Sequence, residues 1–149
     1  MPEQHETTSS TKQTEAVAAR LARSILGGSS MRAPLVILLK GDLGAGKTTF
    51  VRGFVRALPG GEHVVVQSPT FALSRRYPTT PPVQHLDLYR LHDKPGAETA
   101  MRELGLDDDD AGGIMFVEWP VPSTWGVPVV KVEIQILSPR RRRVQISWS

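Results

Sequence analysis

The residues with the clearest chemistry form a glycine-rich segment at positions 41–48. Its sequence, Gly-Asp-Leu-Gly-Ala-Gly-Lys-Thr, matches the phosphate-binding pattern G-x-x-x-x-G-K-[ST] at every fixed position. Glycines let the backbone curl until successive N–H groups point inward at phosphate oxygens. A helix that starts at the loop directs its positive end at the same place. The lysine can reach the β and γ phosphates, and the threonine hydroxyl can ligate Mg²⁺. The predicted nucleotide-binding residues are Gly41, Asp42, Leu43, Gly44, Ala45, Gly46, Lys47, Thr48 and Thr49.

Two acidic residues are candidates for the rest of the chemistry at such a site. Hydrolysis or transfer of a phosphoryl group needs an acid near Mg²⁺ and a group that places the nucleophile. Glu118 directly follows the apolar run 114–117, which is the pattern of a strand that ends in a metal-binding acid, whereas Asp87 lies inside the alternating segment 85–90. The alternatives are an exposed acid at a strand end and an acid on the solvated face of a hairpin. The division of roles between the two acids stays open.

A hydroxyl and an arginine are further candidates. Thr70 lies in the segment Ser-Pro-Thr-Phe at 68–71, where a loop hydroxyl beside the phosphates can sense the γ-phosphate as switch loops do. An ordinary turn accounts for the same segment equally well. Arg90 can stabilise a transferring phosphate as an internal arginine finger, although a surface or ion-pair role is the commoner one for such an arginine.

Three other patterns favour structural roles over chemistry. Trp119 and Trp125 flank a proline-rich loop and are interpreted as packing residues, with a partner contact as the alternative. The arginine run 140–143 is interpreted as a solvated hairpin turn, with contacts to RNA phosphates as the alternative. The aspartate run 107–110 is interpreted as a solvated helix start rather than a metal site.

Length, composition and charge exclude several classes of protein. The chain has 149 residues, which suits a single domain over 11–149. It has no cysteine, so disulfide scaffolds, cysteine-ligated zinc, Fe–S clusters and thiol catalysis are excluded. The net charge is +3, and the run 140–143 supplies four of the positive charges, so the chain is not evenly basic like a protein that coats nucleic acid.

Residues 1–10 are polar and are expected to form a disordered tail, without the apolar core of an export signal. No stretch is long and apolar enough to span a membrane, so the expected location is the cytoplasm.

The pattern of apolar residues predicts the elements that position these groups. The continuous apolar run 35–39, between Pro34 and Gly41, predicts a strand buried on both faces and therefore a sheet with helices on both sides. Ser10 and Gln13 fit a capping box at the start of the first helix. The expected fold is α/β, P-loop NTPase-like, with three αβα layers and a mixed sheet extended by antiparallel strands. The other predicted elements are helices over 12–26, from the loop to about Leu58 and over 97–104, strands over 64–67, 71–77, 83–89 and 114–117, and a C-terminal hairpin over 130–148.

Four motifs in a fixed order resemble the TsaE family, the bacterial ATPases of tRNA threonylcarbamoyladenosine synthesis. The resemblance runs from about Lys12 to Trp148, and its more specific motifs are the last three. The motifs are Gly-Asp-Leu-Gly-Ala-Gly-Lys-Thr-Thr-Phe at 41–50, Ser-Pro-Thr-Phe at 68–71, His-Leu-Asp-Leu-Tyr-Arg at 85–90 and Val-Glu-Trp-Pro at 117–120.

The resemblance implies a function and a role for each matching residue. It implies slow, Mg²⁺-dependent hydrolysis of ATP in support of TsaD and TsaB, which transfer a threonylcarbamoyl group to adenosine 37 of tRNAs that read codons beginning with A. Contact with tRNA is expected only through that complex, with no role for DNA or a membrane. Thr48 and Glu118 match the Mg²⁺ ligands of the family. Asp87 matches the acid needed for hydrolysis, and Thr70 matches a switch-like threonine. Lys47 would act on the phosphates.

Two rival functions remain. A nucleotide-gated binding module with negligible hydrolysis would carry the same loop and would need only binding. A small-molecule kinase would need a pocket for its acceptor and usually a closing lid, and the residues between Gly105 and Gly113 are few for a lid.

Overall fold

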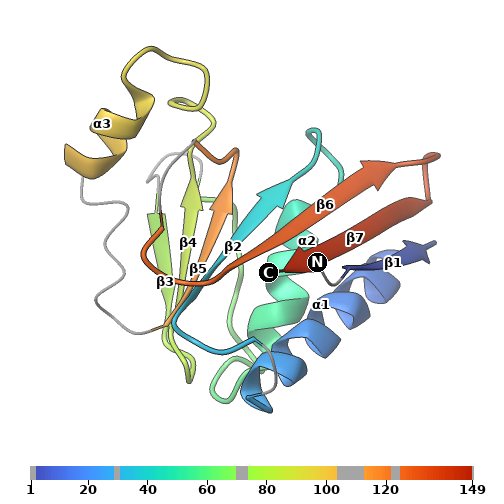
Figure 1. The fold of residues 1–149 in the computed structure, drawn as a ribbon. Helices are drawn as coiled ribbons and strands as arrows, with labels where there is room; N and C mark the ends of the chain where they lie inside the picture. Colours follow the sequence, from blue (N-terminus) through green and yellow to red (C-terminus); the bar gives the residue numbers. More distant parts are fainter. Residues whose placement is uncertain (1–2, 29–30, 70–73, 104–112, 122–124, 149) are drawn as a thin grey trace.

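A central parallel strand organises the sheet on which the rest of the molecule is built. The computed structural model describes residues 3–28, 31–69, 74–103, 113–121 and 125–148. They form a seven-stranded mixed sheet in the order β1-β7-β6-β2-β5-β4-β3 (Figure 1). The elements are β1 (Glu3–Thr8), α1 (Thr11–Leu26), β2 (Leu35–Lys40), α2 (Lys47–Arg56), β3 (Ser74–Tyr77), β4 (Val83–Asp87), α3 (Ala97–Glu103), β5 (Ile114–Glu118), β6 (Val129–Ile136) and β7 (Arg142–Trp148).

Strand β2 is buried on both faces, as its apolar run predicts. It pairs in parallel with β5 on one side and with β6 on the other. Leu35, Ile37 and Leu39 face the larger core under α1 and α2, and Val36 faces the smaller core on the opposite side. The arrowheads of β2, β4 and β5 therefore point the same way in Figure 1, and the carboxyl ends of these strands share one edge of the sheet.

Helices α1 and α2 pack against each other on one face of the sheet. Ser10 is the N-cap of α1, and its Oγ accepts a hydrogen bond of 3.2 Å from Gln13 N. The Gln13 side chain accepts a hydrogen bond of 2.6 Å from Ser9 N, one residue before the position that a capping box uses. The two helices approach so closely at Gly53 that a Cβ there would lie only 2.4 Å from Glu15 O. A glycine at this position is therefore required by the packing of the helices.

The opposite face of the sheet is covered more thinly, by α3 and the segment after β5. Met101 of α3 is fully buried against Leu86 and Val117 of the sheet. Trp125 is partly buried against the same cluster, so its predicted packing role is confirmed. Together with α1 and α2 this gives the expected three-layer α/β fold.

The N-terminal segment differs from the expected disordered tail. Residues Glu3–Thr8 form the edge strand β1, which pairs antiparallel with β7 along its whole length. Thr8 Oγ1 lies 2.8 Å from Thr14 Oγ1 of α1, and Glu6 pairs with Arg20. The prediction was wrong because this strand is held by backbone pairing and polar contacts, which leave no apolar pattern in the sequence.

The predicted strand over 64–67 is also absent, because this segment is irregular. Val66 is buried, but Val65 is 70% exposed. The main chain of Gln67 bonds to a side chain instead of to a neighbouring strand: Tyr77 Oη donates to Gln67 O at 3.1 Å and accepts from Gln67 N at 3.3 Å. The Tyr77 hydroxyl thus satisfies the backbone N–H and C=O of Gln67, which a neighbouring strand would pair in a sheet.

The remaining predicted elements are present where the structure describes them, although the strand predicted over 83–89 ends at Asp87 and the helix predicted to about Leu58 ends at Arg56. Strands β3 and β4 form an antiparallel hairpin, as do β6 and β7. Residues 71–73 of the predicted strand 71–77, Leu104 of the predicted helix 97–104, Gly105 and the run 107–110 lie outside the described residues. Within the described residues, no helix has the length and apolar character needed to cross a bilayer.

Tyr77 should make the stability of the fold sensitive to alkaline pH. Burial raises the pKa of its phenol above the usual value of 10.0. A group whose pKa is raised on folding contributes stability below its unfolded pKa, and that contribution is lost as the pH rises towards the folded value. We expect Tyr77→Phe to lower the free energy of unfolding by about 1–2 kcal/mol at pH 7 by removing its two hydrogen bonds to Gln67, and the deficit to shrink above about pH 10. Urea denaturation of both proteins across this range measures the effect, and parallel pH curves would contradict it.

Candidate functional site

The glycine-rich loop joins the carboxyl end of β2 to the start of α2. Asp42 O accepts a hydrogen bond of 3.0 Å from Ala45 N and closes a turn within the loop. Gly44 and Gly46 have φ angles of +81° and +107°, which residues with a side chain rarely adopt. Gly46 is the N-cap of α2, so the helix begins at the loop. This is the strand, loop and helix arrangement that the pattern requires for binding phosphate.

Lys47 is held inside the loop by two contacts of its ammonium. Its Nζ donates a hydrogen bond of 2.7 Å to Gly41 O and lies 3.8 Å from the centroid of the Trp119 ring. The residue is only 6% exposed. Burial lowers the pKa of Lys47, against the opposing effect of the nearby carboxylates of Glu118, Asp87 and Asp42. Within the described residues, Gly41 O is the one hydrogen-bond acceptor in contact with the ammonium, so an arriving anion would stabilise its charged form.

Asp87 and Glu118 lie side by side at the ends of neighbouring strands. They are register partners in the parallel pair β4–β5. Asp87 is buried, and its two carboxylate oxygens accept hydrogen bonds from Tyr89 N at 3.0 Å and from Ser68 Oγ at 3.3 Å. The sequence left the choice between the two acids open, and the structure brings both to the same edge of the sheet.

Glu118 has a buried partner in His85. Glu118 is 3% exposed, His85 is fully buried, and His85 Nε2 lies 2.5 Å from Glu118 Oε2. Among the described residues, His85 Nδ1 has no hydrogen-bond partner. A buried N–H donor without an acceptor is costly, so the proton is best placed on Nε2, where it is donated to Glu118. This contact fixes one oxygen of the carboxylate.

One cavity of about 510 Å³, termed the loop cavity, gathers most of the predicted site. Arg90 is not among its lining residues. Thr70 lies outside the described residues, so its role stays a prediction. The lining residues are Leu43, Gly44, Gly46, Lys47, Thr48, Thr49, Ser68, Asp87, Tyr89, Glu118 and Trp119.

The donor atoms in the loop cavity suit a small hard cation. Thr48 offers a hydroxyl, and Asp87 and Glu118 offer carboxylates. Mg²⁺ prefers such oxygen ligands and is usually held by one or two carboxylates together with substrate phosphates. In the part of the chain that the structure describes, no group of three or more His, Cys, Asp or Glu side chains is placed to hold a metal by itself. These residues fit a magnesium ion that arrives with a nucleotide.

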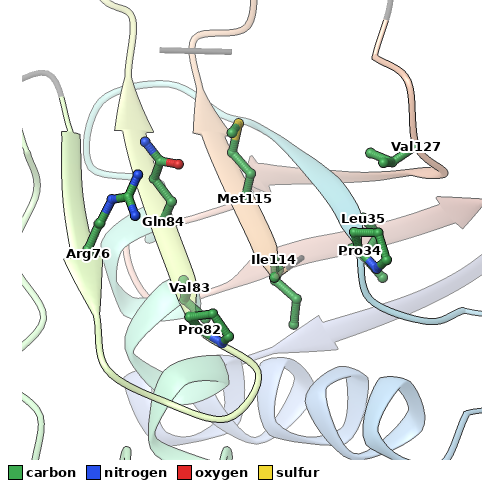
Figure 2. Close-up of a pocket in the computed structure, with 10 residues that line it drawn as sticks. Pro34, Leu35, Arg76, Pro82, Val83, Gln84, Ile114, Met115 and Val127 are labelled. Carbon is green, nitrogen blue, oxygen red and sulfur yellow. The ribbon is translucent and has the colours of Figure 1, made fainter. Parts of the chain in front are cut away.

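Two more cavities lie at other places. The helix cavity, of about 470 Å³, lies beyond the glycine-rich loop, between the start of α1 and the β6–β7 turn. A small apolar pocket of about 40 Å³ lies at the opposite edge of the sheet, near Pro82, Ile114 and Pro34 (Figure 2), and is too small for a nucleotide. The helix cavity is lined by Ser9, Ser10, Thr11, Thr14, Gly44, Ala45, Gly46, Thr49, Pro139, Arg140 and Arg142.

Sequence reasoning missed several residues that contact the site, among them Trp119 and Arg142. Trp119 was interpreted as a packing residue, but its ring lies against the Lys47 ammonium. The Tyr89 ring meets the Trp119 ring in an edge-to-face arrangement, with 5.0 Å between the ring centroids. Its φ of +55° is strained for a tryptophan, and such strain is concentrated at functional sites. Arg142 is partly buried against the loop, so the solvated-turn interpretation is wrong for this arginine. The position of Trp119 directly after Glu118 was the available signal, whereas nothing in the sequence separates Arg142 from its neighbours.

The fold and the loop together define the class of P-loop NTPase-like α/β proteins. The crystal structure of YdiB from Bacillus subtilis matches the chain with a TM-score of 0.69 at 27% identity, covering 97% of this chain and 84% of that one. A family model described as threonylcarbamoyl adenosine biosynthesis protein TsaE matches residues 8–145. The chain therefore belongs to the TsaE family.

Two curated relatives show how far the similarity extends. Each is named tRNA threonylcarbamoyladenosine biosynthesis protein TsaE. The Rickettsia felis protein is 31% identical over 138 residues, which cover 91% of this chain and 74% of the relative. The Bacillus subtilis protein is 43% identical over 86 residues, 56% of this chain and 49% of the relative. That second match thus spans about half the length of the relative.

The contributions of His85 and Glu118 to the free energy of unfolding should depend on each other. Removing the donor in His85→Leu leaves a buried carboxylate oxygen without its hydrogen bond, which typically costs about 1.5–3 kcal/mol of free energy of unfolding. The double variant His85→Leu/Glu118→Gln removes the charge as well and should recover part of that loss. Urea denaturation of the wild type, both single variants and the double variant gives the coupling. Independent, additive losses would show that the two side chains do not depend on each other.

Proposed function

We propose that this chain is an ATPase that supports the threonylcarbamoyl modification of adenosine 37 in tRNAs reading codons beginning with A. The proposal rests on membership of the TsaE family and on one observation of the site. Lys47, Thr48, Asp87 and Glu118, which come from three separate segments of the chain, line the same cavity at the glycine-rich loop. Those are the residue types that phosphoryl chemistry on a nucleotide needs.

The loop cavity and the helix cavity, two of the cavities beside the glycine-rich loop, suggest how ATP would lie. The triphosphate would enter the loop cavity, where the loop N–H groups and the start of α2 face it. The nucleoside would extend over the loop into the helix cavity, near Ser10 and Thr11. Both cavities share Gly44, Gly46 and Thr49 in their walls, so one ligand of this length can occupy both.

Each side chain would then have a distinct role. Lys47 would exchange its contact with Gly41 O for the β and γ phosphates. Thr48 and Glu118 would hold Mg²⁺, with His85 fixing one oxygen of Glu118. When bound, the ion would neutralise charge that develops on the phosphate oxygens. Asp87 would orient the attacking water and accept its proton, and Thr70 would respond to the γ-phosphate.

The proposed partners are TsaD and TsaB, with tRNA reached only through their complex. In this arrangement the chain does not transfer the threonylcarbamoyl group; it supports or resets the complex that does. The place of action would be the cytoplasm, where tRNA is modified.

Substitutions of Lys47 and Asp87 should separate binding from hydrolysis. Lys47→Ala removes the charged donor to the phosphates and should weaken ATP binding about a hundredfold. Asp87→Asn keeps an acceptor for Tyr89 N but cannot take a proton, so it should bind ATP normally and hydrolyse it at least about a hundredfold more slowly. Calorimetry with Mg²⁺ measures affinity, and phosphate release measures turnover.

The matched control for these variants is Lys40→Ala. Lys40 is an exposed lysine next to the loop and does not line the loop cavity, so its loss should leave both measurements unchanged. Unchanged ATP affinity in Lys47→Ala would remove the lysine from the site. Normal turnover in Asp87→Asn would remove the aspartate from the mechanism.

A second candidate function, a nucleotide-gated binding module with negligible hydrolysis, is favoured by one observation. Both carboxylate oxygens of Asp87 already accept hydrogen bonds from Tyr89 N and Ser68 Oγ, which lowers their capacity to activate water. Reconstitution separates the two functions. Purified TsaD, TsaB, tRNA and threonylcarbamoyl-adenylate are combined with the wild type, with Asp87→Asn or with no added chain.

The expected result is several modified tRNAs per complex with the wild type and about one or fewer with Asp87→Asn or without the chain. Full multiple-turnover activity with Asp87→Asn, or with a non-hydrolysable ATP analogue, would favour the binding module. Equal product with and without the chain would contradict both functions.

A further inference from the structure

One arginine of the C-terminal hairpin is fastened to the glycine-rich loop. Arg142 is the first residue of β7, and its Nε donates a hydrogen bond of 3.0 Å to Ala45 O. Its Nη2 donates to Gly44 O at 3.2 Å. On the hairpin side, Nη1 donates to Ser138 O at 2.9 Å and to Arg141 O at 3.0 Å. A single guanidinium therefore joins the turn of the hairpin to two consecutive carbonyl groups of the loop.

These contacts determine the direction of a neighbouring N–H group. In a trans peptide unit the C=O and N–H bonds point in opposite directions because the unit is planar. When Ala45 O is held towards Arg142, the N–H of Gly46 in the same peptide unit points away from the hairpin. Gly46 and Gly44 carry the positive φ angles of the loop, and glycine backbones keep the most conformational freedom. Arg142 therefore holds the carbonyl groups of Gly44 and Ala45, in the part of the loop where glycines leave the backbone most flexible.

We propose that Arg142 is a positioning residue that preorganises the loop for a nucleotide's phosphates, an inference that rests on the proposed function. It acts through the loop carbonyls. Holding the loop before a ligand arrives removes part of the entropy cost of binding. The planar fork of an arginine can donate to carbonyls in several directions at once, whereas a lysine ammonium is a point charge on a flexible stem. Arginine is thus specifically suited to this position.

Long-range charge and direct ligand contact are two alternative routes by which Arg142 could strengthen binding. Its positive charge could attract phosphates at a distance, in which case a lysine would serve equally well. It also lines the helix cavity, where it could contact the nucleoside directly. In that case its loss would weaken binding of ATP but not of a polyphosphate without a nucleoside.

Calorimetry with two ligands and two substitutions distinguishes these possibilities. ATP and inorganic tripolyphosphate, each with Mg²⁺, are titrated into the wild type, Arg142→Lys and Arg142→Gln. Arg141→Lys and Arg141→Gln are the matched controls, because Arg141 is the exposed neighbour in the same turn. We expect both Arg142 variants to lose about tenfold in affinity, the effect of about one charged hydrogen bond, by the same factor for both ligands. The controls should bind like the wild type.

Any different result overturns a defined part of the proposal. Wild-type affinity in Arg142→Lys would assign the effect to charge, and a loss confined to ATP would assign it to nucleoside contact. Failure of the wild type to bind tripolyphosphate while it binds ATP would show that the loop does not hold phosphates by itself. Failure of the wild type to bind either ligand would instead overturn the proposed function. Thermal unfolding is measured for every variant, and Arg142→Lys alone decides the matter if Arg142→Gln does not fold.

Discussion

Parallel pairing of β2, β5 and β4 is the constraint on which the site depends. The register places Leu39 beside Glu118 and Glu118 beside Asp87, so the end of each strand meets the end of the next. The glycine-rich loop leaves the sheet at the same edge. The two acids thus converge from distant segments of the chain through the register of the backbone alone. A shift of one residue in any of these pairings would turn an acid from the cavity to the other face of the sheet.

The same edge carries an unusual density of buried charge. Lys47, Asp87 and Glu118 are each less than 10% exposed, and desolvation is costly for every one of them. The structure offsets this cost locally, through His85 at Glu118, backbone and hydroxyl donors at Asp87, and an aromatic face at Lys47. Among the described residues, the lysine ammonium has the least complete set of partners, since it contacts one carbonyl and one ring. A phosphate group would give the lysine ammonium further hydrogen-bond acceptors. Binding of the ligand would therefore offset part of the cost of burying this charge.

The sequence predicted what depends on local pattern and missed what depends on contacts between distant segments. The loop has a fixed spacing, and β2 and the β6–β7 hairpin have clear apolar patterns, so each could be found directly. Strand β1 is polar on both faces and is held by its neighbour β7, and the valines at 64–66 are apolar without being paired. Arg142 reaches the loop across 97 positions. Its three neighbouring arginines have the same side chain, so only the three-dimensional structure could distinguish it.

Charged residues on the outermost strands of the described sheet have a consequence for how these molecules behave in solution. Strands at a sheet margin expose unpaired backbone groups that can recruit a strand from another molecule. Here β1 carries Glu3 and Glu6, and β3 carries Arg75 and Arg76. Joining two copies through the same strand, β1 to β1 or β3 to β3, would bring like charges together and strip them of water. The charged N-terminal strand, which covers the edge of β7, therefore disfavours pairing of two copies through β1.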